Sequence, residues 1–265
     1  MADALALGSP EPVYSGPAAE MFGDELPQAR KYAELLVGPG VDRGIVGPAE
    51  AERIWDRHLL NCGAIAHLIP ARGSLVDLGS GAGLPGIVLA ILLPGVQVTL
   101  LEAMARRVEF LQMCVAELGL TNAVVVRGRA EDLAGHLLAD VVTARAVAPL
   151  DKLVGLCAGL VRPGGRVLAI KGASAETELA RARPMLMRLG VTDARVVEVG
   201  SANGSSAATV VMFSVPGRRS AGQASGRAAV RAAGRVAGRP GGQAGYPGVP
   251  AGGRKSRPNS RRGGG

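Results

Sequence analysis

The stretch of residues 75–86, LVDLGSGAGLPG, constrains the fold of this chain more than any other. An apolar run typical of a strand passes through a carboxylate and then reaches three glycines spaced two apart, Gly79, Gly81 and Gly83. Glycine has no Cβ, so the backbone can turn tightly there and approach a ligand closely. The free N–H groups of a helix that follows can meet an anionic or hydroxyl-bearing group. We therefore predict a strand, turn and helix that bind a nucleotide-type ligand.

The glycines alone do not identify that ligand, because residues 81–86 also satisfy the dinucleotide pattern G-x-G-x-x-G. Two carboxylates favour S-adenosylmethionine over NAD: Asp77 precedes the first glycine by two residues, and Glu102 ends the next expected strand. A carboxylate at that strand end can accept both hydroxyls of a ribose. A salt bridge to Arg106 is the structural alternative. The residues expected to bind the cofactor here are Asp77, Gly79, Gly81, Gly83, Leu84 and Glu102.

From residue 73 onward, segments of strand and helix character alternate. The expected strands are residues 74–79, 96–102, 123–127, 140–144, 165–171, 193–199 and 207–215, and the expected helices are 84–93, 104–118, 130–138, 149–161 and 174–189. This alternation is typical of an α/β fold with a doubly wound parallel sheet. Residues 200–206 are too few for a helical crossover, so the last two strands should pair antiparallel. We predict a Rossmann-like, seven-stranded, mostly parallel sheet with a reversed terminal strand.

Two helices are expected before the sheet. Residues 19–37 show helical periodicity, and a second helix begins at Pro48 with an apolar face that Arg57, His58 and Asn61 interrupt. The expected organisation is an irregular leader (1–18), an N-terminal helical extension (19–72), the sheet domain (73–217) and an Arg/Gly-rich disordered tail (218–265).

The net charge of +8 belongs to the tail. Residues 218–265 hold 11 of the 30 basic residues and none of the 22 acidic ones, which leaves 19 basic against 22 acidic residues elsewhere. The tail has almost no large apolar residue and cannot bury a core, so we expect it to be disordered. It is either an accessory that attracts RNA phosphate or a dispensable extension.

Several classes of protein are disfavoured by composition. No apolar run approaches the ~20 residues of a membrane span. The first basic residue is Arg30, the reverse of a signal peptide, so a cytoplasmic protein is expected. Cys62, Cys114 and Cys157 are far apart in apolar helical patterns and are expected to be buried free thiols. The histidines form no ligand cluster, and we predict no metal.

Polar residues follow the other strands at the edge where the glycine turn is expected. Ala130 and Glu131 follow the third strand, where an exposed turn could bond an adenine edge, although an ordinary helix start is the alternative. Arg145 ends the fourth strand and faces either the cofactor's methionine part or an RNA phosphate. Lys171 ends the fifth and contacts substrate phosphate, unless it is a solvated strand-end lysine.

The chain shows no Ser-His-Asp set, no paired carboxylates and only seven aromatic residues, too few for a platform of stacked bases. Methyl transfer remains compatible with this inventory, since a sulfonium methyl is already activated and the enzyme mainly supplies position. A ring nitrogen such as guanine N7 has a lone pair and no proton to remove, so no general base is needed.

Five ordered motifs carry a family resemblance: residues 57–61 (RHLLN), 77–86 (DLGSGAGLPG), 127–131 (RGRAE), 142–147 (VTARAV) and 169–172 (AIKG). Together they resemble the bacterial small-subunit rRNA guanine-N7 methyltransferase G family, also called glucose-inhibited division protein B. The resemblance implies a class I methyltransferase that transfers a methyl group from S-adenosylmethionine to N7 of a guanine in the decoding-site loop of 16S rRNA.

The resemblance also implies roles for individual residues. Those that match the family's cofactor contacts are Gly79, Leu84, Ala130, Glu131 and Arg145. Arg57, His58 and Lys171 match a rim near the substrate, and Arg145, Lys171 and His58 are the catalytic candidates. Cys62 departs from the serine expected after the first motif.

The expected partner is 16S rRNA or the small ribosomal subunit, bound by a monomer without a membrane or metal. Two alternatives stay open at this point: an NAD-linked oxidoreductase or sensor that uses the same glycine turn, and an RNA-binding module without catalysis. Uptake of S-adenosylmethionine but not NAD separates the first alternative from methyl transfer.

Overall fold

The computed structural model of this chain describes residues 16–200 and 207–217. The predicted leader up to residue 15 and the predicted tail from residue 218 lie outside the described residues, and so does the segment 201–206. Among the helices that are described, none is both long and apolar enough to cross a membrane.

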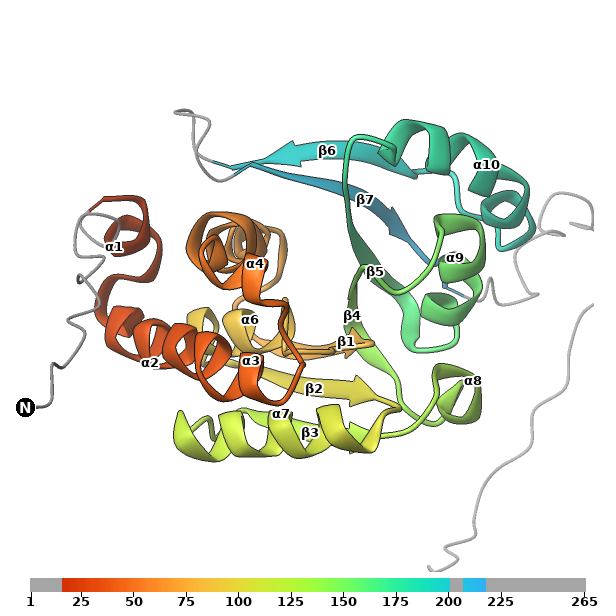
Figure 1. The fold of residues 1–265 in the computed structure, drawn as a ribbon. Coiled ribbons are helices and arrows are strands. Elements are labelled where there is room, and N and C mark those ends of the chain that lie inside the picture. Colours follow the sequence, from red (N-terminus) through yellow and green to blue (C-terminus); the bar gives the residue numbers. More distant parts are fainter. Residues whose placement is uncertain (1–15, 201–206, 218–265) are drawn as a thin grey trace, which may run out of the picture. The chain divides into compact units, whose positions relative to one another are not determined.

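A seven-stranded sheet forms the centre of the fold, in the order β3-β2-β1-β4-β5-β7-β6 (Figure 1). The strands are β1 (Gly73–Leu78), β2 (Val96–Glu102), β3 (Ala123–Arg127), β4 (Ala139–Arg145), β5 (Val161–Lys171), β6 (Arg195–Val199) and β7 (Ala208–Ser214). β7 pairs antiparallel with both β5 and β6, and the neighbouring pairs from β3 to β5 are parallel. The predicted fold class and its reversed terminal strand are confirmed.

Helices cover both faces of the sheet, so both faces are buried. Successive residues of the central strands point to opposite faces and therefore belong to different cores. Leu75 of β1 belongs to the core on one face and Val76 to the core on the other. The first core lies under α6 (Gly86–Leu92) and α7 (Ala105–Glu117). The second lies under α8 (Ala130–Leu133), α9 (Leu150–Ala158) and α10 (Ala175–Arg188).

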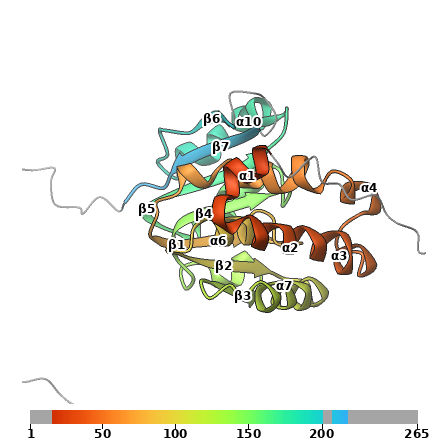
Figure 2. The same ribbon diagram turned by 90° about the vertical axis from the view of Figure 1, so that its left-hand side faces the viewer.

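The N-terminal segments join the core of α6 and α7 (Figure 2). They are α1 (Pro17–Phe22), η2 (Gly23–Glu25), α2 (Leu26–Val37), α3 (Pro39–Asp42), α4 (Pro48–Ala51), the π-helix η3 (Ile54–Leu60), α5 (Asn61–Gly63) and η4 (Ala66–Leu68). Phe22 packs edge-on against Trp55, with ring centroids 6.1 Å apart. Lys31 of α2 pairs with Glu117 of α7 at 3.1 Å.

The prediction of two continuous N-terminal helices is wrong. The first breaks at Gly23, whose φ of +50° belongs to the left-handed region, and helical structure begins at Pro17 rather than residue 19. The second breaks at residues 52–53, after which the chain winds as the π-helix η3. A π-helix places its side chains at a different angular spacing from an α-helix.

Among the other boundaries, two differ most from prediction. The helix expected at residues 130–138 ends at Leu133, because Ala134 leaves the helical conformation with a ψ of 126° and Gly135 turns with a φ of +77°. β5 begins four residues earlier than expected, at Val161, with a register shift against β4 between Ala139 and Val141.

Candidate active site

The glycine turn lies at the carboxyl end of β1, beside β4. The strand order reverses there, because the chain builds outward from β1 through β2 to β3 and then returns to place β4 on the other side of β1. Ligands of open α/β sheets bind at such a switch point. Gly79 and Gly81 adopt φ values of +68° and +58°. The N–H of Gly79 donates a hydrogen bond to the Leu101 carbonyl oxygen at 2.8 Å, which ties the turn to β2.

The space where a side chain at position 81 would lie is open, and the space where a side chain at position 86 would lie is filled. A Cβ on Gly81 would lie no nearer than 3.8 Å to its closest neighbour, the Gly79 carbonyl oxygen. A Cβ on Gly86 would lie 2.6 Å from the Asp77 carboxylate. Glycine at 86 therefore lets α6 approach the sheet, and glycine at 81 keeps an open cradle of the kind a nucleoside needs.

Asp77 supports the turn from beneath. Its side chain is fully buried, and its two oxygens accept hydrogen bonds from the Thr143 hydroxyl at 3.0 Å and the Gly86 N–H at 3.1 Å. It thus ties β1, β4 and α6 together. Direct contact between Asp77 and the cofactor stays a prediction.

Burial raises the pKa of Asp77 to about 6, against the lowering effect of its hydrogen bonds to Ser80, Thr143 and Gly86. Between about pH 4 and this value the folded state holds a proton that the unfolded state has released, so stability falls as pH rises. The ionised carboxylate costs about 3 kcal/mol of folding free energy above that range. An asparagine amide can accept from Gly86 and donate to Thr143.

We expect Asp77→Asn to remove this fall, so that its free energy of unfolding at pH 7 equals or exceeds that of the parent. Urea titrations at several pH values between about 4 and 7 measure the slope. Asp140→Asn is the control of opposite sign, because hydrogen bonds from Ser74 lower the pKa of Asp140 and stabilise the fold at neutral pH. If the free energy of unfolding changed with pH in the same way in the parent and in Asp77→Asn, protonation of Asp77 would not contribute to the pH dependence of stability.

Glu102 lies at the end of β2, opposite the turn, with its side chain 5% exposed. One carboxylate oxygen accepts from the N–H groups of Ala103 and Met104 at 2.8 and 2.9 Å, and the other accepts from Gly81 at 3.0 Å. The second oxygen keeps a lone pair for a ligand hydroxyl. The salt-bridge alternative involves Arg107, at 3.7 Å, rather than Arg106.

The end of β3 adjoins Glu102. The N–H of Gly128 donates to the Glu102 carbonyl at 3.1 Å, which brings the following residues to the same edge of the sheet. Ala130 is buried at the start of α8 and Glu131 is exposed. Their contact with the adenine part of the cofactor stays a prediction.

Arg145 meets the N-terminal extension at the end of β4. Its guanidinium donates to the Cys62 sulfur at 3.0 Å, the Arg57 carbonyl at 3.3 Å and the His58 Nδ1 at 2.6 Å. The first and fourth sequence motifs, more than 80 residues apart, therefore form one cluster. Ala146, directly after Arg145, has a φ of +54°, a strained conformation typical of functional sites.

Cys62 can serve as the acceptor for Arg145 that a serine hydroxyl would otherwise supply. Burial raises the pKa of its thiol to about 11, so it is neutral at physiological pH. Cys62, Cys114 and Cys157 are all buried free thiols, as predicted. Within residues 16–200 and 207–217, no three His, Cys, Asp or Glu side chains are placed to hold a metal ion.

Lys171 is not a solvated strand-end lysine, because its side chain is 8% exposed. Its ammonium donates to the Ala148 carbonyl at 2.8 Å and pairs with Glu178 at 2.8 Å. It therefore holds the loop after β4 against α10. Contact between Lys171 and substrate phosphate stays a prediction.

Sequence reasoning missed three residues of this edge. Tyr32 of α2 is fully buried and donates its hydroxyl to the Ala82 carbonyl in the glycine turn at 2.8 Å. Thr143 holds Asp77, and Glu50 accepts from His58. Tyr32 lies inside a helix and leaves no motif. Thr143 lies inside the motif at residues 142–147, but nothing in the sequence assigned it a role, and Glu50 stands in the first turn of a helix, where a carboxylate is common.

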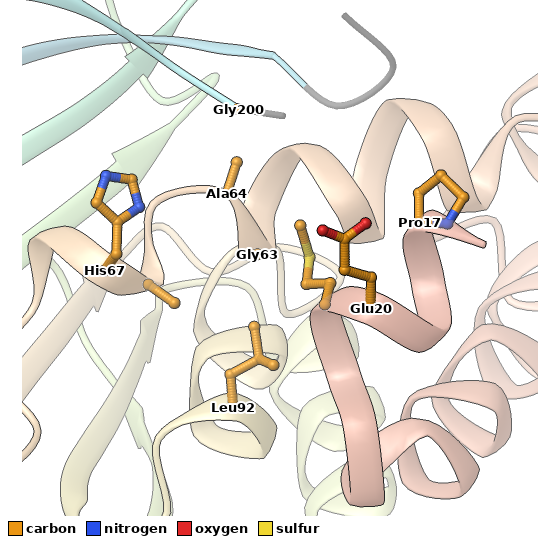
Figure 3. A pocket seen from close by; sticks show the side chains of 9 residues that line it. Pro17, Glu20, Gly63, Ala64, His67, Leu92 and Gly200 are labelled. Carbon is orange, nitrogen blue, oxygen red and sulfur yellow. The ribbon is translucent and has the colours of Figure 1, made fainter. Parts of the chain in front are cut away.

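A separate cavity of about 570 Å³ lies between α1, the segment after η3 and the end of α6 (Figure 3). Glu20, His67 and Leu92 are among its lining residues. None of the residues predicted for the site lines it, so it is distinct from the edge described above.

The sheet order, the glycine turn and the carboxylate that ends β2 define a Rossmann-like class I methyltransferase. A solved structure with this fold is the S-adenosylmethionine-dependent methyltransferase SibL in its apo form, at a TM-score of 0.52 and 18% identity, over 77% of this chain and 71% of that one. At this identity the likeness concerns the fold alone.

The family follows from the sequence matches. The family model for rRNA small subunit methyltransferase G matches residues 25–206. Proteins named ribosomal RNA small subunit methyltransferase G are 53% identical in Thermobifida fusca, over 77% of this chain and 86% of that protein, and 50% identical in Mycobacterium sp. (strain JLS), over 72% and 86%. The chain belongs to the rRNA small subunit methyltransferase G family. The predicted family, the methyltransferase class and S-adenosylmethionine as the cofactor are confirmed.

Proposed function

We propose that this chain transfers a methyl group from S-adenosylmethionine to N7 of a guanine in the decoding-site loop of 16S rRNA. The observation that carries the proposal is the convergence at one sheet edge of the glycine turn, Glu102 and the Arg145 cluster. Family membership supplies the substrate, and the geometry supplies the sites for donor and acceptor.

The cofactor supplies an activated sulfonium methyl group when bound. Glu102 accepts one ribose hydroxyl with its remaining lone pair, and the glycine turn gives the nucleoside close access to the backbone. Three of the five N–H donors of Arg145 are used by its bonds to Cys62, Arg57 and His58. The other two are available for the methionine carboxylate or an RNA phosphate.

The neutral state of the His58 imidazole suits transfer to guanine N7. Burial is the first cause that lowers the pKa of His58, and the Arg145 charge is the second. Both His58 ring nitrogens are engaged, one by Arg145 and one by Glu50, so His58 is not poised to remove a proton. Guanine N7 has no proton to remove, and the site has to supply only position and charge.

The rRNA side of the site lies at the π-helix. Arg57 is exposed beside His58 and pairs with Glu50 at 3.0 Å, an exposed contact that an RNA phosphate can replace at little cost. We propose that Arg57 and His58 form the rim that contacts 16S rRNA or the small subunit. Because the substrate is ribosomal, we propose that the protein acts in the cytoplasm. We also propose that it acts as a monomer.

Comparing methylated guanines in 16S rRNA from cells with and without this protein tests the function. We expect one N7-methylated guanine in the decoding-site loop to disappear, and purified protein with S-adenosylmethionine to restore it on 16S rRNA or on small subunits. NAD in place of S-adenosylmethionine should neither bind nor support the reaction. An unchanged methylation map would refute the proposed substrate.

A further inference from the structure

Glu50 is the last member of a chain of hydrogen bonds that reaches Arg145. It lies in the short helix α4, and its Oε2 is 2.7 Å from the His58 Nε2. The other ring nitrogen of His58, Nδ1, is 2.6 Å from the Arg145 guanidinium. These two hydrogen bonds thus connect the surface helix α4 with the end of β4. The side chain of His58, which joins them, is 14% exposed.

The direction of each bond follows from the chemistry of the groups. A guanidinium has donors only, so the His58 Nδ1 must accept from Arg145. A neutral imidazole has one donor and one acceptor, so Nε2 carries the proton and donates to Glu50. Glu50 is therefore the group that stabilises the one tautomer of His58 able to hold Arg145.

We propose, on the basis of the function proposed above, that Glu50 is a positioning residue for methyl transfer: it fixes the tautomer of His58 and thereby holds Arg145 at the site. Arg145 has three flexible side-chain bonds beyond Cβ, and the Nδ1 contact is the shortest of its hydrogen bonds. Without that contact the guanidinium loses its place relative to the cofactor.

The charged groups that face His58 set how the cluster responds to pH. Burial and the Arg145 charge lower the pKa of His58, Glu50 raises it, and Arg57 on the same π-helix lowers it slightly. The thiol of Cys62, also bonded to Arg145, is neutral. Protonating His58 would place a proton on Nδ1 against the guanidinium, so activity should fall as pH drops through the His58 pKa, which is lowered from the ordinary value of a histidine.

Two variants of Glu50 separate the effect of its hydrogen-bond acceptor from the effect of its negative charge. Glu50→Gln keeps a carbonyl that can accept from Nε2 and loses the charge, so kcat/KM for S-adenosylmethionine at pH 7.5 should stay within about threefold of the parent. Glu50→Ala loses both and should lower kcat/KM about tenfold, as expected for a lost hydrogen bond to a charged group. Both should move the acid limb of the pH profile to lower pH.

Controls distinguish this role from a structural one. Glu52→Gln changes an exposed carboxylate two residues away in the sequence and should alter neither kcat/KM nor the acid limb. Arg57→Met should move the limb in the opposite direction, to higher pH, because Arg57 lowers the pKa of His58. A Glu50→Ala protein with a lower melting temperature but parental kcat/KM and pH profile overturns the proposal.

The tautomer can be measured without any reaction. ¹⁵N chemical shifts of the His58 imidazole in the full chain should show Nδ1 unprotonated and Nε2 protonated at pH 7.5, and a mixture of tautomers in Glu50→Ala. Nδ1 protonated in the parent overturns the Glu50 proposal whatever the substrate. If instead the parent transfers no methyl group to rRNA, the proposed function fails while the NMR result still decides the tautomer.

Discussion

Replacing Glu102 with alanine is expected to weaken the binding of S-adenosylmethionine about a hundredfold and leave the protein folded. The variant loses the acceptor for one ribose hydroxyl and also the carboxylate that holds the Gly81 N–H at 3.0 Å, so the turn itself is less ordered for its ligand. Hydrogen bonds to charged groups contribute roughly 1.5–3 kcal/mol each, and losing one such bond and part of another accounts for the factor.

The fold should survive because the other groups that Glu102 serves can reach water. Ala103 and Met104, whose N–H groups donate to the carboxylate, are exposed residues. Isothermal titration with S-adenosylmethionine measures the affinity, and circular dichroism checks the fold. Glu102→Gln keeps one carbonyl oxygen and should have intermediate affinity.

Arg107→Met is the control for the Glu102 variants. Its side chain is 40% exposed and its contact with Glu102 is 3.7 Å long, so its charge should matter little to the affinity. Near-parental affinity in Glu102→Ala would remove Glu102 from the cofactor site and leave the glycine turn as its main contact.

The parts of the fold that were predictable from sequence are those with a local cause. The glycines at 79 and 81 require positive φ, and the eight residues between Val199 of β6 and Ala208 of β7 are too few for a helical crossover. Alternation of strand and helix then makes the sheet mostly parallel. These features depend on neighbours in the sequence, and the structure confirms them.

The predictions that failed, or were missed, depend on distant partners. Residues 48–69 keep an apolar periodicity throughout, and nothing local distinguishes an α-helix from the π-helix η3, which brings His58 to Arg145. Lys171 reads as an exposed strand end because its partner Glu178 lies on the next helix. Tyr32 reaches Ala82 across 50 residues. Side-chain pairs of this kind leave no pattern in the sequence.

The candidate site shows the same division. The carboxyl ends of β1, β2 and β4 were placed together by topology alone, and with them Glu102 and Arg145. Burial was not predicted: Asp77 lies beneath the turn, and each of its carboxylate oxygens accepts a hydrogen bond from within the protein. Topology therefore predicts which residues meet, and packing decides which of them face a ligand.

Replacing Arg145 with alanine is expected to lower kcat for methyl transfer at least a hundredfold. Preorganised donors aimed at a reacting group typically contribute 10²–10³ in rate. Three acceptors of the N-terminal extension hold Arg145, so little reorganisation is needed during the reaction. Single-turnover transfer to 16S rRNA at saturating S-adenosylmethionine measures the step directly.

The fold of Arg145→Ala should remain intact. Arg145 is partly exposed, and its contact with the Arg57 carbonyl is exposed, whereas the buried Cys62 sulfur that it leaves is only a weak acceptor. Arg166→Ala is the matched control: Arg166 lies in the neighbouring strand β5 and donates to the Leu68 carbonyl at 2.9 Å, so it also ties the sheet to the N-terminal segments. It should transfer methyl groups at the parental rate.

Arg145→Lys decides whether charge or shape matters. An ammonium keeps the charge but cannot bond Cys62, Arg57 and His58 in the planar arrangement of a guanidinium. If positioning by the N-terminal extension is the cause, Arg145→Lys should be nearly as slow as Arg145→Ala and should lose the acid limb that His58 imposes. Parental turnover in Arg145→Lys would mean that charge alone suffices, and parental turnover in Arg145→Ala would exclude Arg145 from the reaction.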